Sequence, residues 1–186
     1  MKRIFDLILA LFSIIIFFVP IILISILIKT ESKGPVFFLS RRVGKNNKIF
    51  KMLKFRTMIV DTPLLHSNDL KYSEKYITKL GSILRKYSLD ELPQIYNVLI
   101  GEMSFVGPRP ALENQYELVK KRNNLGINLL TPGITGLAQI KGRDQISFED
   151  KVKYDLEYKE KKSFILDLLI LIKTIKVVRK AEGVKH

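Results

Sequence analysis

The fold depends first on residues 7–28, LILALFSIIIFFVPIILISILI, the most apolar stretch of the chain. Only Ser13, Pro20 and Ser25 interrupt it. At about 1.5 Å per residue, a helix of this length spans ~33 Å, enough to cross the hydrocarbon core of a bilayer. The run is too long for the apolar part of a signal peptide, and no small-residue cleavage pattern follows it. The stretch therefore predicts a membrane anchor.

The path of this anchor through the membrane has two solutions. Lys2 and Arg3 precede it and Lys29 follows it, so the basic flanks do not select an orientation. Pro20 removes a backbone donor near the middle and favours a kink there. A kinked helix can return to the face it entered, whereas a helix that tolerates the proline crosses to the other side. Residues 1–33 are assigned to the anchor and residues 34–186 to one compact domain at the cytoplasmic face.

The composition excludes several kinds of site. There are 32 Lys and Arg against 18 Asp and Glu, a formal net charge of +14. The chain has no cysteine, which excludes thiolate catalysis and a Cys-ligated metal. Its two histidines are His66 and His186, too few to favour a Ser–His–Asp triad. The basic block at residues 29–60 adjoins the anchor, and no nucleic-acid-binding motif is present. A phospholipid surface is the expected partner, and nucleic acid is not.

The remaining pattern predicts an α+β domain that is mostly helical. Strands are expected at 36–40 and 49–58, joined at 44–47 into a small β-hairpin, with helices at 73–86, 92–100, 111–123, 147–161 and 164–180. A surface loop is expected at 61–72 and rigid irregular segments at 107–110 and 131–136. The helix at 164–180 is amphipathic with a basic end, which suits either a membrane interface or the core of the domain.

The segment YSLDELPQ, residues 87–94, holds two adjacent carboxylates at a predicted helix start. In one interpretation, Ser88 and Glu91 form a capping box and satisfy free backbone donors. In the other, a carboxylate held at a helix N-terminus stays ionised and can attack phosphorus, while a neighbouring carboxylate holds Mg²⁺ beside phosphate oxygens. The octapeptide by itself favours the capping box.

Three further segments place cations where a phosphate could bind. Lys54 and Arg56 fall on one face of a predicted strand, Arg109 lies between two prolines, and Arg143 follows a glycine turn. Guanidinium groups bind phosphate through two parallel hydrogen bonds, so these side chains can converge on a diphosphate. Each of them taken alone is also explained as a solvated surface charge.

At this point the sequence resembles a known family, the bacterial sugar transferases, and within it the small monotopic phosphoglycosyl transferases of the PglC-like type. The matching segments are KRIFD (2–6), KFRTM (54–58), SLDELPQ (88–94), NVL (97–99), GEMSFVGPRP (101–110) and PGITGLAQ (132–139). They occur in the family's order, from residue 2 to about 180.

The resemblance implies a reaction and a set of roles. Asp90 would attack the β-phosphate of a UDP-sugar, expel UMP and carry the sugar phosphate until polyprenyl phosphate accepts it. Glu91 would hold Mg²⁺. The basic positions that would contact phosphate or nucleotide are Lys54, Arg85, Arg109 and Arg143, with Arg56 beside them on the strand.

The resemblance also implies a location. The family's anchor is re-entrant and breaks at a Ser-Pro pair, so Pro20 would be the kink, although Val19 stands where the family has serine. The protein would lie in the bacterial inner membrane, and the sugar would be an N-acetylated hexose. A non-catalytic membrane scaffold for glycan-assembly enzymes is the alternative, and a homodimer is left open.

Overall fold

The computed structural model describes residues 1–60, 74–142 and 146–180. The longer helices are α1 (Lys2–Glu31), α3 (Lys79–Lys86), α4 (Ile95–Ile100), α5 (Tyr116–Asn124), α6 (Leu137–Gly142), α7 (Phe148–Lys161) and α8 (Phe164–Lys180). Short 3₁₀ helices are η1 (Lys45–Asn47), η2 (Glu74–Tyr76), η3 (Leu89–Gln94) and η4 (Ile127–Leu129). The predicted mostly helical fold is confirmed, whereas the loop expected at 61–72 lies outside the described residues.

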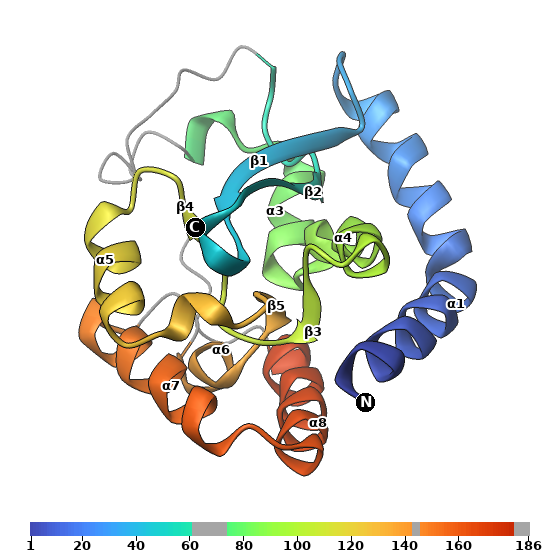
Figure 1. The fold of residues 1–186 in the computed structure, drawn as a ribbon. Helices are drawn as coiled ribbons and strands as arrows, with labels where there is room; N and C mark the ends of the chain where they lie inside the picture. Colours follow the sequence, from blue (N-terminus) through green and yellow to red (C-terminus); the bar gives the residue numbers. More distant parts are fainter. Residues whose placement is uncertain (61–73, 143–145, 181–186) are drawn as a thin grey trace.

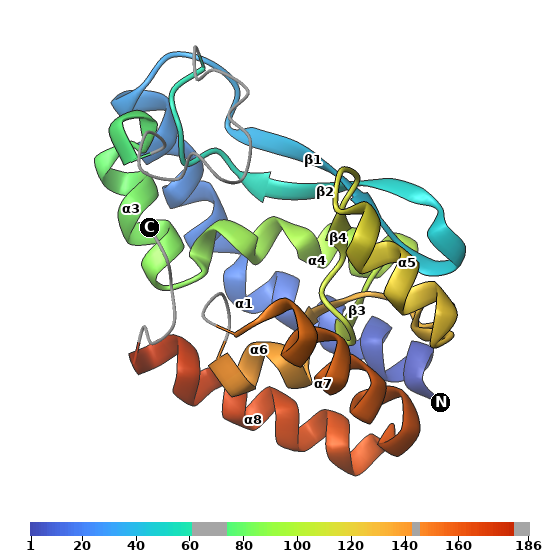
Figure 2. The same ribbon diagram turned by 90° about the vertical axis from the view of Figure 1, so that its left-hand side faces the viewer.

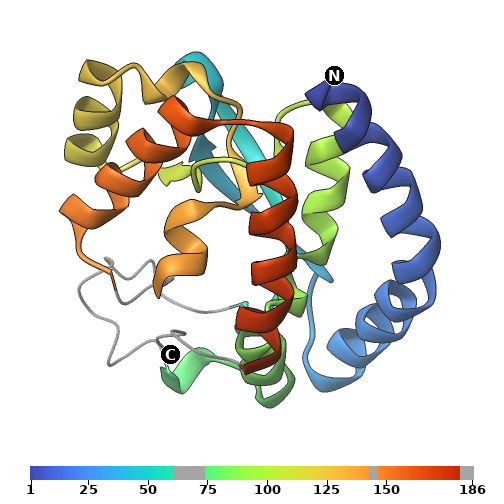
Figure 3. The ribbon, with the colours of Figure 1, turned by 90° about the horizontal axis from the view of Figure 1, so that it is seen from below.

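Helix α1 bows around one flank of the molecule (Figures 1 and 3). It runs continuously through Pro20. A narrow stripe faces the domain and is buried, from Asp6 and Ala10 near the start to Ile24 and Ile28 near the end. The outer face is apolar and exposed, and by length and composition α1 is the one described helix that could cross a membrane. An exposed apolar face of this size is typical of a surface that contacts a membrane or another protein.

Both ends of α1 are fastened to the domain by arginine. Arg3 donates to the carbonyl oxygens of Val98 and Leu99, at 2.5 and 2.6 Å, where α4 ends. Arg56 donates from Nη2 to the carbonyl oxygen of Ser32, at 2.8 Å, just past the end of α1. Each arginine adds hydrogen bonds to carbonyl groups at or just beyond the C-terminal end of a helix. The anchor is therefore built into the fold along its whole length.

The predicted hairpin is confirmed. Strands β1 (Phe37–Val43) and β2 (Ile49–Phe55) pair antiparallel, with Phe37 opposite Phe55. Strand β4 (Ala111–Leu112) adds to the other edge of β1, so the expectation of a helix from residue 111 is wrong at its start. The helix itself, α5, begins only at Tyr116, because the backbone of β4 is already paired with β1.

A second, two-stranded sheet holds the segments expected to be irregular. Strands β3 (Ser104–Val106) and β5 (Gly133–Thr135) are parallel, so the expectation for 131–136 is corrected in part. The two backbone segments lie so close together that a Cβ on Gly133 would lie 2.1 Å from the backbone nitrogen of Gly107. Only glycine permits this approach, which fixes the start of the Pro108–Pro110 segment.

The last two helices close the domain on the side away from the hairpin (Figure 2). Helix α7 starts at the predicted place, where the Ser147 hydroxyl accepts from the backbone N–H of Asp150 at 3.0 Å. Helix α8 buries Ile170 against the domain and leaves Ile165 and Ile172 exposed. The site described below lies between the hairpin and this helical layer.

Candidate functional site

Asp90 and Glu91 lie in η3, a tight 3₁₀ turn that precedes α4. Ser88 opens the turn in the left-handed region, with φ of 54°, and its side chain makes no capping hydrogen bond. The capping box favoured by the octapeptide is therefore wrong. A proline four residues into the segment, Pro93, has no N–H to donate to a regular helix, which is consistent with the 3₁₀ form.

Two cations hold the carboxylate of Glu91. Lys54 Nζ, at the end of β2, lies 2.7 Å from Glu91 Oε1 and 3.3 Å from Asp90 Oδ2. Arg109 binds Glu91 with both terminal nitrogens, at 2.6 Å to Oε1 and 3.3 Å to Oε2. The side chains of Lys54, Asp90 and Glu91 are 11–16% exposed, so the cluster is largely removed from water. Two of the predicted substrate-binding cations thus meet the predicted carboxylates.

The surroundings shift the pKa values of the two carboxyl groups in opposite directions. Burial raises the pKa of Asp90, the positive charge of Lys54 opposes this, and the negative charge of Glu91 adds to it. Burial also acts to raise the pKa of Glu91, but Arg109 and Lys54 together hold that pKa well below its usual range. Glu91 is consequently a fixed negative charge, whereas Asp90 is held less strongly as a carboxylate.

The remaining predicted cations have three different positions. Arg85 donates from Nε to the Thr57 hydroxyl at 2.9 Å; burial lowers its pKa and the charge of Asp90 opposes this, so it belongs to the cluster. Arg56 turns away and binds the end of α1, so it is not brought to the carboxylates. Arg143 lies outside the described residues.

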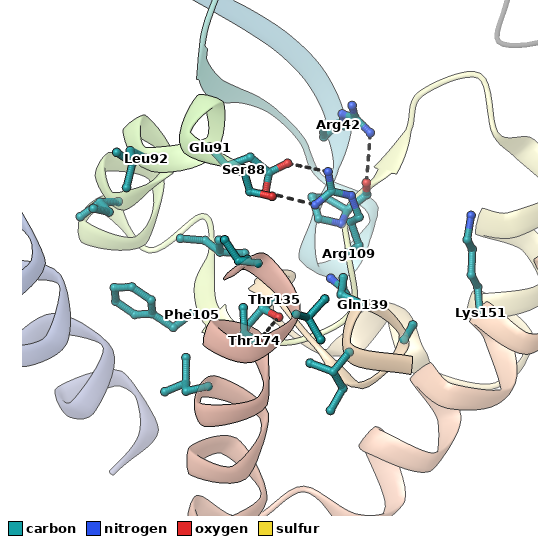
Figure 4. A pocket seen from close by; sticks show the side chains of 18 of the residues that line it. Arg42, Ser88, Glu91, Leu92, Phe105, Arg109, Thr135, Gln139, Lys151 and Thr174 are labelled. Atoms are coloured by element: carbon teal, nitrogen blue, oxygen red, sulfur yellow. Dashed lines mark hydrogen bonds and ion pairs between the residues drawn. The ribbon is translucent and has the colours of Figure 1, made fainter. Parts of the chain in front are cut away.

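Arg42 is a site residue that sequence reasoning did not select. Its Nε donates to the Ser40 hydroxyl at 3.0 Å, and its Nη1 lies 3.4 Å from the carbonyl oxygen of Pro110. Burial and the neighbouring Arg109 lower its pKa to about 10. Figure 4 shows Arg42 and Arg109 side by side above the cavity. The basic block contained Arg42, but nothing local distinguishes it from the exposed Arg41.

A buried ion pair between Arg122 and Asp155 holds the backbone of Arg109 in place. Arg122 on α5 donates from Nη1 to the carbonyl oxygen of Arg109 at 2.8 Å. Its Nη2 lies 2.5 Å from Asp155 Oδ2 on α7, and both side chains are nearly inaccessible. Arg122 and Asp155 therefore fix the backbone from which Arg109 reaches Glu91.

These residues border a cavity of about 850 Å³ that is lined by both polar and apolar side chains. Its polar wall contains Arg42, Glu91, Arg109, Gln115, Arg122, Gln139 and Lys151. Its apolar wall contains Leu9, Phe17, Phe105, Ile134, Leu171, Ile175 and Val178. In Figure 4, Phe105 and Leu92 lie toward α1 while Lys151 lies on the far side. The volume is that of a site for a molecule of nucleotide or drug size.

The carboxylates fit a magnesium ion that is shared with a ligand. Among residues 1–60, 74–142 and 146–180, no group of three or more His, Cys, Asp or Glu side chains could hold a metal by themselves. Mg²⁺ commonly takes one or two carboxylates together with substrate phosphate oxygens and water. Glu91, which borders the cavity, would be one such carboxylate.

Comparison with known proteins gives the family. The model for bacterial sugar transferases matches residues 1–181. The exopolysaccharide production protein ExoY of Sinorhizobium fredii is 39% identical over 197 residues, with 98% of this chain and 87% of the relative covered. The UDP-N-acetylgalactosamine-undecaprenyl-phosphate N-acetylgalactosaminephosphotransferase of Aeromonas hydrophila is 34% identical over 189 residues, covering 99% of this chain and 45% of the relative. The undecaprenyl-phosphate galactose phosphotransferase of Salmonella typhimurium is 34% identical over 199 residues, covering 98% and 41%. With a match along nearly all of its length, this chain belongs to the bacterial sugar transferase family.

Proposed function

We propose that this enzyme moves a sugar 1-phosphate from a UDP-sugar to polyprenyl phosphate and releases UMP. The observation that carries the proposal is the Asp90–Glu91 pair, held by Lys54 and Arg109 beside a cavity with a second arginine, Arg42. Cations on one wall suit a diphosphate, and the adjacent carboxylate suits a nucleophile. The names of the relatives from Aeromonas hydrophila and Salmonella typhimurium describe sugar phosphotransferases that act on undecaprenyl phosphate.

In the first half of the proposed reaction, a carboxylate oxygen of Asp90 attacks the β-phosphorus of the UDP-sugar. The bond between this phosphorus and the bridging oxygen breaks, and UMP leaves with the electron pair. The sugar phosphate remains on Asp90 as an acyl phosphate. Lys54 lies within 3.3 Å of both carboxylates and Arg109 within 3.3 Å of Glu91, so their positive charge would stabilise the negative charge that develops on the transferred group.

In the second half, a phosphate oxygen of polyprenyl phosphate attacks the same phosphorus. The bond to Asp90 breaks, the carboxylate is restored, and the sugar is left on a polyprenyl diphosphate. No step needs a histidine or cysteine as general base, since both nucleophiles are anions at neutral pH. Mg²⁺, held by Glu91 with phosphate oxygens, would supply further neutralisation of charge when bound.

The proposed location is the inner membrane, with the domain at the cytoplasmic face and α1 re-entrant. The arginine contacts at the two ends of α1 support this, because Arg3 and Arg56 fasten both ends to one domain. With both ends bound to the same domain, α1 would enter and leave the bilayer on one face, which is the re-entrant path. The exposed apolar outer face of α1 would then meet lipid.

The experiment is an assay of UMP release with purified enzyme, Mg²⁺, undecaprenyl phosphate and a panel of UDP-sugars. We expect UMP with at least one sugar, and an N-acetylated hexose is the proposed one. Asp90→Asn removes the nucleophile and should abolish release, and Glu91→Gln should reduce it strongly. Omitting Mg²⁺ and adding EDTA should also stop the reaction.

The alternative of a non-catalytic scaffold makes the opposite prediction. If the protein is a scaffold, a folded Asp90→Asn variant would keep its cellular role, as measured by glycan production in a strain lacking the wild-type gene. A transferase with the same substitution would not. UMP release that persists in Asp90→Asn would reject the covalent mechanism even if transfer occurs.

A further inference from the structure

Asn97 joins the helix that follows the two carboxylates to the strand that carries Lys54. It lies on α4, beside β2 (Figures 1 and 2), and its side chain is buried. Its Oδ1 accepts from the backbone N–H of Leu53 at 2.9 Å, and its Nδ2 donates to the carbonyl oxygen of Lys51 at 2.9 Å. These two hydrogen bonds, the Asn97–β2 bonds, occupy the edge of β2 that β1 does not cover. The carboxamide thus bonds to this edge as the backbone of a neighbouring strand would.

Glu102 fixes which way the carboxamide of Asn97 points. Its Oε2 accepts from Asn97 Nδ2 at 2.8 Å, so both hydrogens of the amide nitrogen are used, one by Glu102 and one by the carbonyl of Lys51. The amide oxygen is then left for the N–H of Leu53, which needs an acceptor. One orientation of the amide therefore satisfies all three partners.

The Asn97–β2 bonds adjoin the site in both chain segments that they join. In β2, Lys54 directly follows Leu53, and its Nζ lies 2.7 Å from Glu91 Oε1 and 3.3 Å from Asp90 Oδ2. In the other segment, the turn η3 that holds both carboxylates leads directly into α4. The bonds therefore fasten the segment with the cation to the segment with the carboxylates.

Apolar packing also holds α4 against β2 but is less specific about their relative position. Ile95 and Val98 of α4 belong to one buried cluster with Phe50 and Met52 of β2. Contacts of this kind are not directional, whereas a hydrogen bond weakens steeply when its distance or angle changes. The Asn97–β2 bonds thus fix where along β2 the helix lies, and with it the point from which the flexible lysine side chain starts.

We infer that Asn97 is a positioning residue for the transfer reaction: by holding β2 against α4, it keeps the Lys54 ammonium between Asp90 and Glu91. The inference rests on the proposed function, in which Lys54 stabilises the charge on the transferred group. Asn97 is not among the described residues that line the cavity, so it acts through Lys54 and not on the substrate.

A double-mutant cycle on the single-turnover burst of UMP without acceptor tests the inference. The burst amplitude counts the folded sites, and its rate constant reports transfer of the sugar phosphate to the enzyme. We expect Asn97→Ala to lower this rate constant about 10–100-fold, the loss that follows from a displaced catalytic group. In the Lys54→Met background the ammonium is already absent, so Asn97→Ala should lower it no more than about threefold further.

Two further variants separate the hydrogen bonds from packing and stability. Asn97→Leu keeps most of the side-chain volume and forms neither bond, so its rate constant should match that of Asn97→Ala. Ile127→Ala is the matched control, because Ile127 is buried in a cluster that, among the described residues, contains none from α4 or β2. It should lower the melting temperature and leave the burst rate constant within about twofold of the wild type, as expected for an independent site.

The outcomes distinguish the inference from the proposed function. Equal losses from Asn97→Ala with and without Lys54 would overturn the positioning role and leave the proposed function intact. The same would follow if Ile127→Ala slowed the burst as much as Asn97→Ala. A wild type with no burst for any UDP-sugar would overturn both.

A second measurement uses the wild-type protein and does not depend on variants that fold. Hydrogen exchange of the Leu53 amide reports its bond to Asn97, since this N–H lies on the edge of β2 away from β1. We expect protection as strong as that of the β2 amides that pair with β1. Exchange at the rate of an unbonded amide would overturn the inference.

Discussion

Asp90 and Glu91 are consecutive residues whose surroundings shift their pKa values in opposite directions. Both are buried, but Glu91 receives two ion pairs at 2.6–2.7 Å, and Asp90 has a single longer contact with Lys54. Two carboxyl groups in one site with pKa values pushed apart commonly divide the work between them. This division agrees with the proposed roles, in which Glu91 keeps a negative charge and Asp90 is the nucleophile.

The pH dependence of UMP release should follow Asp90. A nucleophile must be ionised, and burial raises the pKa of this carboxyl group, so activity should fall on the acid side through a pKa above the usual ~3.9. Lys54→Met removes a positive charge that favours the ionised form, so the acid limb should move to higher pH as the rate falls. Lys51→Met on the exposed side of β2 is the control. An acid limb that stays in place in Lys54→Met would contradict this assignment.

Arg42 provides a second prediction at this scale. Because its guanidinium lies beside Arg109 in the cavity wall, Arg42→Met should lower kcat/KM for the UDP-sugar by about 10–150-fold, the loss of one charged hydrogen bond of ~1.5–3 kcal/mol. The adjacent Arg41 is exposed and pairs with Glu113, so Arg41→Met should change little. Equal kinetics for the two variants would remove Arg42 from the site.

Lys54, Arg85 and Arg109 show how much of the site the sequence could predict. Lys54 and Arg109 bind the carboxylates directly, whereas Arg85, which only the family resemblance selected, bonds to Thr57 and interacts with Asp90 through its charge. Arg56 was misplaced because it follows the last residue of β2, where the strand alternation no longer applies, and it binds the carbonyl oxygen of Ser32 just past the end of α1. Arg42 was missed because its burial depends on β4, which comes almost seventy residues later in the chain.

At the scale of elements, long periodic segments were predictable and short ones were not. Helices α7 and α8 begin and end close to the predicted residues, and the hairpin follows from its turn and alternation. Helix α6 and strand β5 were missed. They are too short to show a period, and they form because Gly107 and Gly133 allow two backbones to touch.

The ion pair between α5 and α7 gives a prediction for these elements. Removing one partner of a buried pair leaves an uncompensated charge, so Arg122→Met or Asp155→Leu should each cost about 3–5 kcal/mol of unfolding free energy. The double variant should be more stable than the less stable of the two single variants. Denaturant unfolding of the wild type, both single variants and the double variant measures this coupling as a double-mutant cycle.

Arg122 also holds the carbonyl of Arg109, so the double variant should still show a raised KM for the UDP-sugar after its stability is restored. A raised KM together with restored stability would separate the positioning role of Arg122 from its role in folding. Arg122→Lys, which can keep the charge, should recover part of the KM. Wild-type kinetics in the double variant would limit the pair to a structural role.

For the whole molecule, the testable feature is that both ends of α1 are fastened to one domain. The chain has no cysteine, so single cysteines can report which side of a membrane each end occupies. We expect Thr30→Cys and a cysteine placed before Met1 to react with a membrane-impermeant maleimide only in inside-out vesicles, as should Lys48→Cys in the exposed hairpin turn. An N-terminal cysteine that reacts in intact cells would show that α1 spans the membrane.

The cavity beside Glu91 gives the proposed reaction a kinetic consequence. If the same space admits first the nucleotide sugar and then the lipid phosphate, UMP should depart before the acceptor enters. The two substrates should then bind in turn and not together. Double-reciprocal plots should then form parallel lines, and UMP should compete with the lipid. A cell that accumulates UMP would slow its own glycan initiation at this step.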